Sequence, residues 1–84
     1  MDAQVIWALL WQSLQGGNYD IESLQTRVRD DSHFVDEMGI DSLDLVEFYL
    51  RLEEHVHVSL EADDYANLTS VQAIMTFLQE HSRT

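Results

Sequence analysis

The sequence predicts an all-α protein: a four-helix bundle of three main helices and a short third one, with a long loop after the first helix. Proline is absent and there are only three glycines, so residues that break helices are scarce. No segment alternates apolar and polar residues over the length of a strand. Apolar residues instead recur in several segments at the spacing of one helix face.

The first helix is expected over Ala3–Leu14, with Asp2 as its N-cap. Its apolar stripe consists of Ile6, Leu9, Leu10 and Leu14, widened by Trp7 and Trp11. These aromatic side chains, like Phe48 and Phe77, are interpreted as core residues rather than as a ligand site because they lie on helical stripes. Gly16, Gly17 and Asn18 are expected to end the helix, since they tolerate the left-handed backbone conformation common at helix ends.

Residues 16–40 are predicted to be mostly loop, with about one turn of helix suggested by Ile21, Leu24 and Val28. A loop of this length without contacts would be unusual in so small a protein. The later part of the loop is therefore expected to be anchored in the core by Phe34, Val35 and Met38.

The clearest helix is predicted over residues 42–54, with Asp41 as its cap. A short third helix is expected over residues 61–67. The last helix is expected to begin at Thr69 or Ser70, because residues 69–72 fit the capping-box pattern. Its inner stripe consists of Val71, Ile74, Phe77 and Leu78.

Composition excludes several functions. The 84 residues contain sixteen acids against four basic side chains, for a net charge of -12 and a pI near 4.2. Such a chain lacks the basic patch needed to bind nucleic acid or an anionic membrane surface, whereas it suits a basic protein partner. It has no cysteine and no apolar run long enough for a membrane span. Asp2 stands where a signal peptide needs a base, so we expect a cytoplasmic protein. The length predicts one domain over residues 1–84, and we expect it to be a monomer.

Chemistry is expected at the start of the helix over residues 42–54. With Asp41 as the cap, Ser42 falls on the first helical turn with its hydroxyl outward. Free backbone N–H groups and the positive end of the helix dipole favour an anion there. A phosphate ester on Ser42 would therefore be well placed.

The same helix carries two apolar stripes. Leu45, Phe48, Tyr49 and Leu52 form the one expected to face the core. The second stripe consists of Leu43, Val46, Glu47 and Leu50, with acids beside it. An exposed apolar stripe rimmed by charge is typical of a protein-docking surface.

Residues 34–44 read Phe-Val-Asp-Glu-Met-Gly-Ile-Asp-Ser-Leu-Asp, and Val46-Glu47 and Leu52-Glu53-Glu54 follow. This stretch resembles an acyl carrier protein. The resemblance continues through Leu60 to residues 69–72, so it covers roughly the last fifty residues and, more loosely, the first helix.

The resemblance implies that Ser42 carries a 4'-phosphopantetheine arm through a phosphodiester, and that the arm's thiol holds acyl groups as thioesters. It also implies a separate phosphopantetheinyl transferase that uses coenzyme A and Mg2+. The chain itself would be a carrier for fatty-acid, lipid or polyketide-type enzymes, and not an enzyme. By position, the implied contacts to basic partner enzymes are Asp41, Asp44, Glu47 and Glu53, with Leu43, Val46 and Leu50 as apolar contacts.

Two other functions stay open: a carrier of aminoacyl or peptidyl groups, and an unmodified acidic adaptor that docks on a basic partner. Asp44 directly after the Ser-Leu pair and the acid-rich helix favour acyl cargo. A catalytic serine is disfavoured because there is no G-x-S-x-G motif and the sequence places none of the four histidines near Ser42.

No metal site is expected. His55 and His57, with Glu53 and Glu54 beside them, lack a ligand spacing typical of a metal site. Tyr65 departs from the family pattern, which predicts either an altered cavity for the acyl chain or a tyrosine edge turned to solvent.

Overall fold

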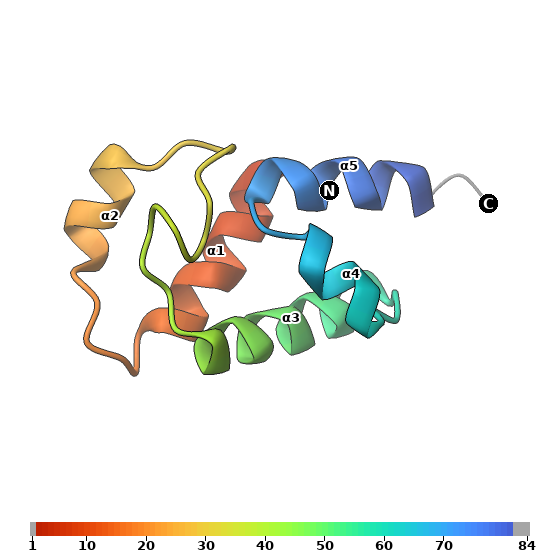
Figure 1. Cartoon of the computed structure of the whole chain (residues 1–84), viewed down its shortest axis with the longest axis horizontal. Helices are drawn as coiled ribbons and strands as arrows, with labels where there is room; N and C mark the ends of the chain where they lie inside the picture. Colours follow the sequence, from red (N-terminus) through yellow and green to blue (C-terminus); the bar gives the residue numbers. More distant parts are fainter. Residues whose placement is uncertain (1, 82–84) are drawn as a thin grey trace.

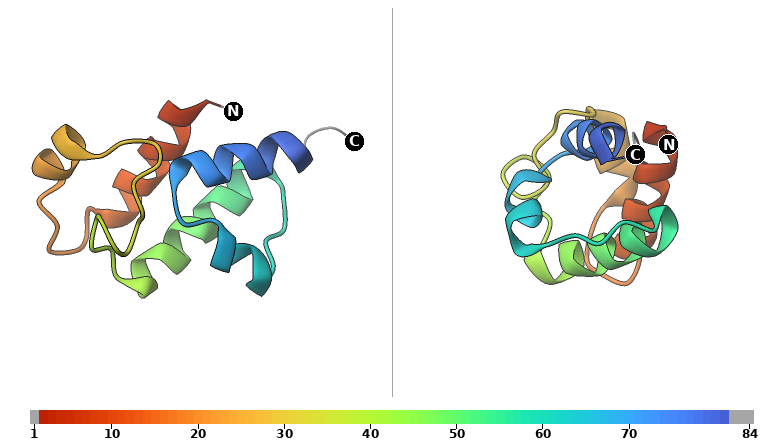
Figure 2. Two further views of the ribbon diagram at one scale, coloured as in Figure 1. Left: turned by 45° about the horizontal axis from the view of Figure 1, so that its top comes forward. Right: turned by 90° about the vertical axis from the view of Figure 1, so that its right-hand side faces the viewer.

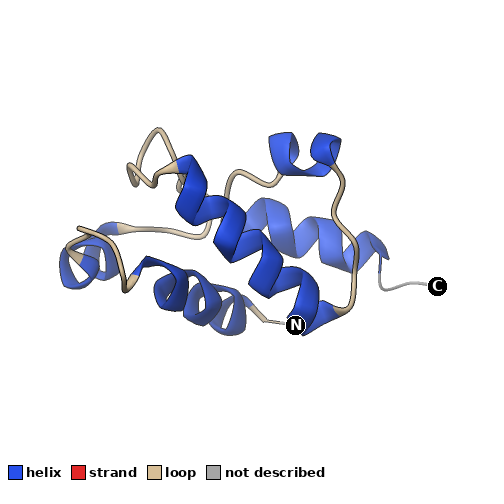
Figure 3. Ribbon diagram, turned by 90° about the horizontal axis from the view of Figure 1, so that it is seen from below, coloured by secondary structure: helices blue, strands red, loops and turns tan. Residues whose placement is uncertain are grey.

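The computed structural model describes residues 2–81 and contains, within that range, five helices and no strand (Figure 1). They are α1 (Ala3–Leu14), α2 (Ile21–Arg27), α3 (Ser42–Val56), α4 (Ala62–Asn67) and α5 (Val71–His81). The predicted all-α class is confirmed, and Figure 3 shows these helices joined by loops alone. None of the described helices is both long and apolar enough to cross a membrane.

The three longest helices surround the hydrophobic core, and α1 contacts both α3 and α5. Seen along the long axis, the helices and the long loop form a ring around this core (Figure 2, right). The radius of gyration is 12.1 Å, as expected for a compact chain of this length. The buried side chains are Ile6, Leu10, Leu14, Leu24, Phe34, Met38, Ile40, Leu45, Phe48, Tyr49, Leu52, Leu68, Val71 and Ile74.

Helix α1 has the predicted bounds, and the carboxylate of Asp2 accepts a hydrogen bond from the Val5 N–H as its cap. Contrary to the prediction, the helix does not end through a residue in the left-handed conformation. Its C-cap, Gln15, is in the right-handed conformation, and the Gly17 N–H closes the following turn by donating to the Leu14 carbonyl at 3.1 Å. Among the described glycines a positive φ occurs at Gly39, not at Gly16 or Gly17.

The loop after α1 contains more helix than predicted. Asp20 caps α2 by accepting from the Ser23 N–H at 3.1 Å, and the helix runs for seven residues instead of about one turn. Leu24 is buried, as expected for the anchor of this segment, and Ile21 and Val28 are half-buried.

The later part of the loop is anchored by Phe34 and Met38, both buried as predicted. Val35 is 47% exposed, so its predicted place in the core is wrong. The segment forms a tight turn in which the Gly39 N–H donates to the Val35 carbonyl and Gly39 adopts φ 71°. Successive side chains of such a turn point in different directions, so Phe34 and Val35 cannot both face the core.

Helix α3 begins at Ser42 as predicted and continues two residues past the expected end, to Val56. His57 stops it in the left-handed conformation, with φ 58°. Helix α4 begins at Ala62 because Glu61 is its N-cap, in a reciprocal capping box with Asp64.

Helix α5 begins at Val71, one or two residues after the expected start at Thr69 or Ser70. The Ser70 hydroxyl accepts the Ala73 N–H at 3.1 Å, so Ser70 caps the helix. The capping box predicted over residues 69–72 is therefore not formed. The Thr69 carbonyl has another role, since it accepts the Phe34 N–H at 2.9 Å.

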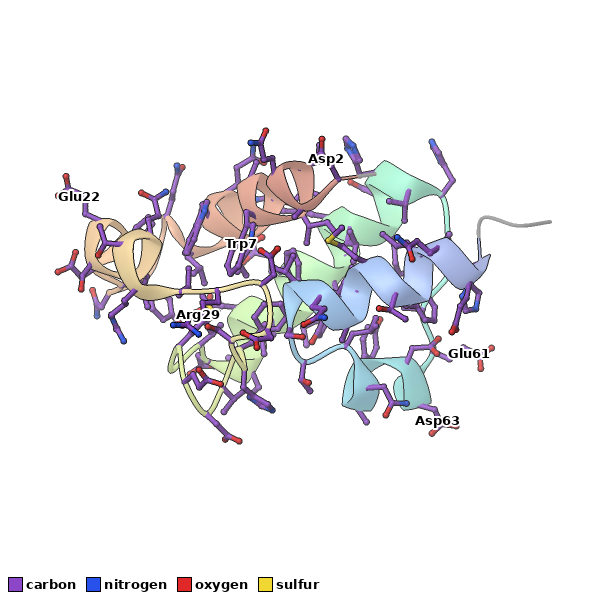
Figure 4. All side chains as sticks on the ribbon, turned by 90° about the horizontal axis from the view of Figure 1, so that it is seen from above. Asp2, Trp7, Glu22, Arg29, Glu61 and Asp63 are labelled. Carbon is purple, nitrogen blue, oxygen red and sulfur yellow. The ribbon has the colours of Figure 1, made fainter. Side chains whose placement is uncertain are left out.

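The loop before α3 is fixed to α1 and α5 around Asp30. The Asp30 carbonyl accepts the Gln72 N–H at 2.7 Å, and its carboxylate accepts the Trp7 indole N–H at 2.8 Å. Trp7 stacks on Trp11 with 5.2 Å between the ring centroids, and Figure 4 labels Trp7 on α1 beside this loop. Together with the Phe34–Thr69 bond, these contacts hold the chain that leads into Ser42.

Candidate functional site

Ser42 is the first residue of α3 and is exposed. The preceding Asp41 is the N-cap: its backbone is extended, and its Oδ1 atom accepts the Leu43 N–H at 2.9 Å. The Asp41 carbonyl already accepts the Leu45 N–H at 3.1 Å, so the helix begins without a frayed turn. The serine hydroxyl therefore stands at the positive end of a fifteen-residue helix dipole, where an anionic ester is favoured.

Three of the residues predicted to meet partners form an exposed apolar stripe along α3. Leu43 is 79% exposed, Val46 50% and Leu50 54%. Val35, from the preceding turn, adds a further exposed apolar side chain. The stripe begins directly beside Ser42, as its spacing predicted.

The four acids predicted to meet partners differ in their surroundings. Glu47 is exposed and faces Arg51 across 3.9 Å, a surface ion pair of small energy. Asp41 caps the helix, as described above. Asp44 and Glu53 are only half-exposed, and each accepts a hydrogen bond from a tyrosine. The sequence predicted the Asp41 cap but gave no sign of the tyrosine bonds to Asp44 and Glu53.

Tyr19, which the sequence did not single out, contacts both sides of Ser42. Its hydroxyl accepts the Asp41 N–H at 2.9 Å and donates to Asp44 Oδ2 at 2.6 Å. Tyr65 makes the corresponding bond near the other end of α3, donating to Glu53 Oε1 at 3.0 Å. No local pattern could have found these contacts, because Tyr19 lies 25 residues from Asp44 in the chain.

A groove of about 250 Å³ opens beside Ser42, between α3, α4 and the turn before α3. Its walls are mostly apolar and include Phe34, Val35, Leu45, Val46, Tyr49, Tyr65 and Ala66. Tyr65 stacks on Tyr49 with 4.9 Å between centroids, so of the two alternatives predicted for Tyr65 it is the cavity that the structure supports.

One histidine does lie near Ser42, contrary to the prediction. His33 lines the same groove, and its Nδ1 atom accepts the N–H groups of Val35 and Asp36 at 3.2 and 3.0 Å. The ring thus caps the turn before α3. His57 is the C-cap of α3, and the described residues contain no group of three or more side chains placed to hold a metal ion.

Acidic residues also lie far from α3. Figure 4 labels Asp2, Glu22, Glu61 and Asp63, which belong to the ends or first turns of α1, α2 and α4. Acidic side chains therefore occur on several helices, and what distinguishes α3 is the apolar stripe between its acids.

An exposed serine that begins a helix, next to an apolar groove that shares Val46 with an exposed apolar stripe, is the kind of site that a covalently attached carrier arm requires. Residues 20–78 match the family described as phosphopantetheine attachment site. The acyl carrier protein of Clostridium acetobutylicum is 30% identical over 57 residues, which make up 68% of this chain and 74% of that relative. The chain belongs to the acyl carrier protein family, as its sequence motifs predicted.

The cofactor of this family is 4'-phosphopantetheine, and its members are carriers rather than catalysts. The residues present fit that group. Ser42 offers an exposed hydroxyl at a helix start, and the neighbouring groove has apolar walls. When bound, the arm supplies a terminal thiol on which acyl groups are held as thioesters.

Proposed function

We propose that this protein carries acyl groups on a 4'-phosphopantetheine arm attached to Ser42 and presents them to biosynthetic enzymes of the fatty-acid, lipid or polyketide type. The observation that carries the proposal is the position of Ser42: exposed, first in α3, behind an Asp cap and beside an apolar groove. In the attachment step the Ser42 oxygen forms a bond to phosphorus and loses its proton. The pyrophosphate bond of coenzyme A breaks, and adenosine 3',5'-bisphosphate leaves.

Partner enzymes are proposed to dock on the stripe of Leu43, Val46 and Leu50. Its apolar side chains would be buried on contact, and Glu47 would face a basic residue of the partner. Asp41, Asp44 and Glu53 would add negative charge beside the stripe, and each keeps free acceptor sites for a basic partner side chain besides the one hydrogen bond it accepts within the protein. We further propose that the carrier is a monomer, since copies with a charge of -12 repel one another. We also propose that it acts in the cytoplasm.

Acyl cargo is favoured over aminoacyl or peptidyl cargo by the groove. Its walls are nearly all apolar, and an alkyl chain loses no hydrogen bonds on entering such a space, whereas an amino acid's charged amine would be desolvated. Loading reactions with acyl-activating and aminoacyl-activating enzymes, run on the same arm-bearing protein, separate the two. Preferred loading by the aminoacyl-activating enzyme would contradict the proposed cargo.

The test of the attachment site is intact mass after incubation with a phosphopantetheinyl transferase, coenzyme A and Mg2+. The wild type is expected to gain one phosphopantetheine, and Ser42→Ala to gain none. Ser23→Ala is the matched control, because Ser23 is an exposed serine in the first turn of α2, behind the Asp20 cap. A wild type without a mass gain would favour the unmodified adaptor, and a gain that survives Ser42→Ala would place the arm elsewhere.

A further inference from the structure

The hydroxyl of Tyr19 joins the two residues that flank the start of α3. It accepts the N–H of Asp41, directly before Ser42, and donates to the carboxylate of Asp44, two residues after it. The Asp41 N–H lies outside the helix and has no helical carbonyl to bond. Tyr19 therefore closes this turn from a separate segment, between α1 and α2.

Tyr19 is itself fixed by the turn after α1. A Cβ atom on Gly17 would lie 2.7 Å from Tyr19 Cε2 and 2.9 Å from Cδ2, so the ring occupies space that only glycine leaves free. The Gly17 N–H is bonded to the Leu14 carbonyl, and Leu14 is a core residue. Tyr19 is therefore connected, through Gly17 and Leu14, to the core of the bundle, and this connection fixes the position of its hydroxyl.

The charge state of this hydroxyl suits its role. Burial of the ring and the hydrogen bond to Asp44 raise the pKa of Tyr19 above its ordinary value, while the bond from the Asp41 backbone acts the other way. The hydroxyl therefore keeps its proton at neutral pH and can donate to Asp44. That bond is short, at 2.6 Å, as expected for a hydroxyl bonded to a carboxylate.

We propose that Tyr19 is a positioning residue that holds residues 41–44 in the conformation in which Ser42 accepts the arm. The inference rests on the proposed function of Ser42. Without the hydroxyl, water replaces Tyr19 as the partner of the Asp41 N–H and the Asp44 carboxylate, the link between residues 41 and 44 is lost, and only part of the population holds the accepting geometry. A partner that binds only that part sees its apparent affinity reduced by the same fraction.

The control is Thr76 of α5, which is exposed, lies outside the groove and the docking stripe, and donates its hydroxyl to the Gln72 carbonyl at 3.1 Å. Wild type, Tyr19→Phe and Thr76→Val, each variant lacking one hydroxyl, are loaded by a phosphopantetheinyl transferase at several concentrations of unloaded protein. For Tyr19→Phe, KM for the protein is expected to rise about fivefold with little change in kcat, the effect of about 1 kcal/mol. For Thr76→Val, both constants are expected to stay within about twofold of the wild type, as for an ordinary surface substitution.

The hydrogen bond between the Asp41 N–H and the Tyr19 hydroxyl is monitored by NMR of unloaded protein, from the chemical shift and hydrogen exchange of the Asp41 amide. In Tyr19→Phe this amide resonance is expected to move and its hydrogen exchange to accelerate, whereas in Thr76→Val it stays unchanged. Gly17→Ala tests the same link without touching the hydroxyl. Gly17 does not have a positive φ, so an added methyl acts through the Tyr19 ring, and it is expected to reproduce the Tyr19→Phe defect in part.

Three outcomes would overturn the inference while leaving the proposed function intact: wild-type kinetics in Tyr19→Phe, an unmoved Asp41 amide, or equal losses in Tyr19→Phe and Thr76→Val. The last would mean a general loss of stability, which melting curves of all variants report independently. A wild type that gains no arm at all would overturn the proposed function and this inference with it.

Discussion

Tyr49 provides a buried hydroxyl whose effect on stability should depend on pH. The side chain, on α3, is buried and stacks on Tyr65 of α4, and its hydroxyl donates to the Leu68 carbonyl at 2.7 Å. Desolvation on burial, and to a lesser extent the charge of nearby Tyr65, raise the pKa of Tyr49 from its ordinary 10 to about 12. The perturbation is Tyr49→Phe, which keeps the ring and removes only the hydroxyl.

At neutral pH the variant loses one hydrogen bond and leaves a buried carbonyl unpaired, which costs about 1–2 kcal/mol of unfolding free energy. The folded protein holds the Tyr49 proton more tightly than the unfolded chain, so this residue's contribution is complete below pH 10 and falls as the pH rises from 10 toward 12. For a pKa shift of two units, ionisation of Tyr49 lowers the unfolding free energy by roughly 2.7 kcal/mol once the pH is well above both pKa values. At pH 11 the loss is already about 1.4 kcal/mol. The stability advantage of the wild type over Tyr49→Phe should therefore shrink to nearly nothing by pH 11.

The assay is urea unfolding of both proteins at pH 8, 9, 10 and 11, followed by circular dichroism. Tyr19 and Tyr65 titrate in both proteins, so their contributions largely cancel in the difference. A difference in unfolding free energy that stays constant from pH 8 to pH 11 would refute the reasoning. It would mean that the Tyr49 hydroxyl ionises as easily in the folded protein as in the unfolded chain.

Gly39→Ala should lower the unfolding free energy by about 1 kcal/mol, because Gly39 has φ 71° and no neighbour within 4 Å that a methyl could contact. Gly16→Ala is its control, with open space and no positive φ, and should be neutral or slightly stabilising in the same urea titration. Glu47→Lys should weaken binding to a basic partner enzyme and flatten its dependence on salt, measured by calorimetry at several ionic strengths. Unchanged binding would exclude α3 as the docking helix, and Glu47→Gln separates loss of charge from its reversal next to Arg51.

Features that depend on neighbouring residues were predictable from the sequence. The Asp2 and Asp41 caps follow from residue type and position, and the bounds of α1 and the start of α3 follow from the caps and the apolar stripes. The exposed stripe beside Ser42 was found in the same way, because a helix with two apolar faces can bury only one of them against a small core.

Features that depend on residues far apart in the chain were not predictable. The acids Asp44 and Glu53 look alike in sequence to Glu47, yet their bonds to Tyr19 and Tyr65 span 25 and 12 residues. The exposure of Val35 likewise depends on a turn fixed by the Phe34–Thr69 hydrogen bond. Alternation and helical spacing carry no information about such pairings, which only the folded chain brings together.

Helix α4 differs from the other helices in residues 2–81 because none of its six residues is buried. It is held by its Glu61–Asp64 capping box and by the stack of Tyr65 on Tyr49. A segment with so little buried surface can open locally at a small fraction of the free energy that unfolds the whole protein. Since Tyr65 and Ala66 form one wall of the groove, we expect local opening of α4 to widen the space beside Ser42 while the rest of the bundle stays folded.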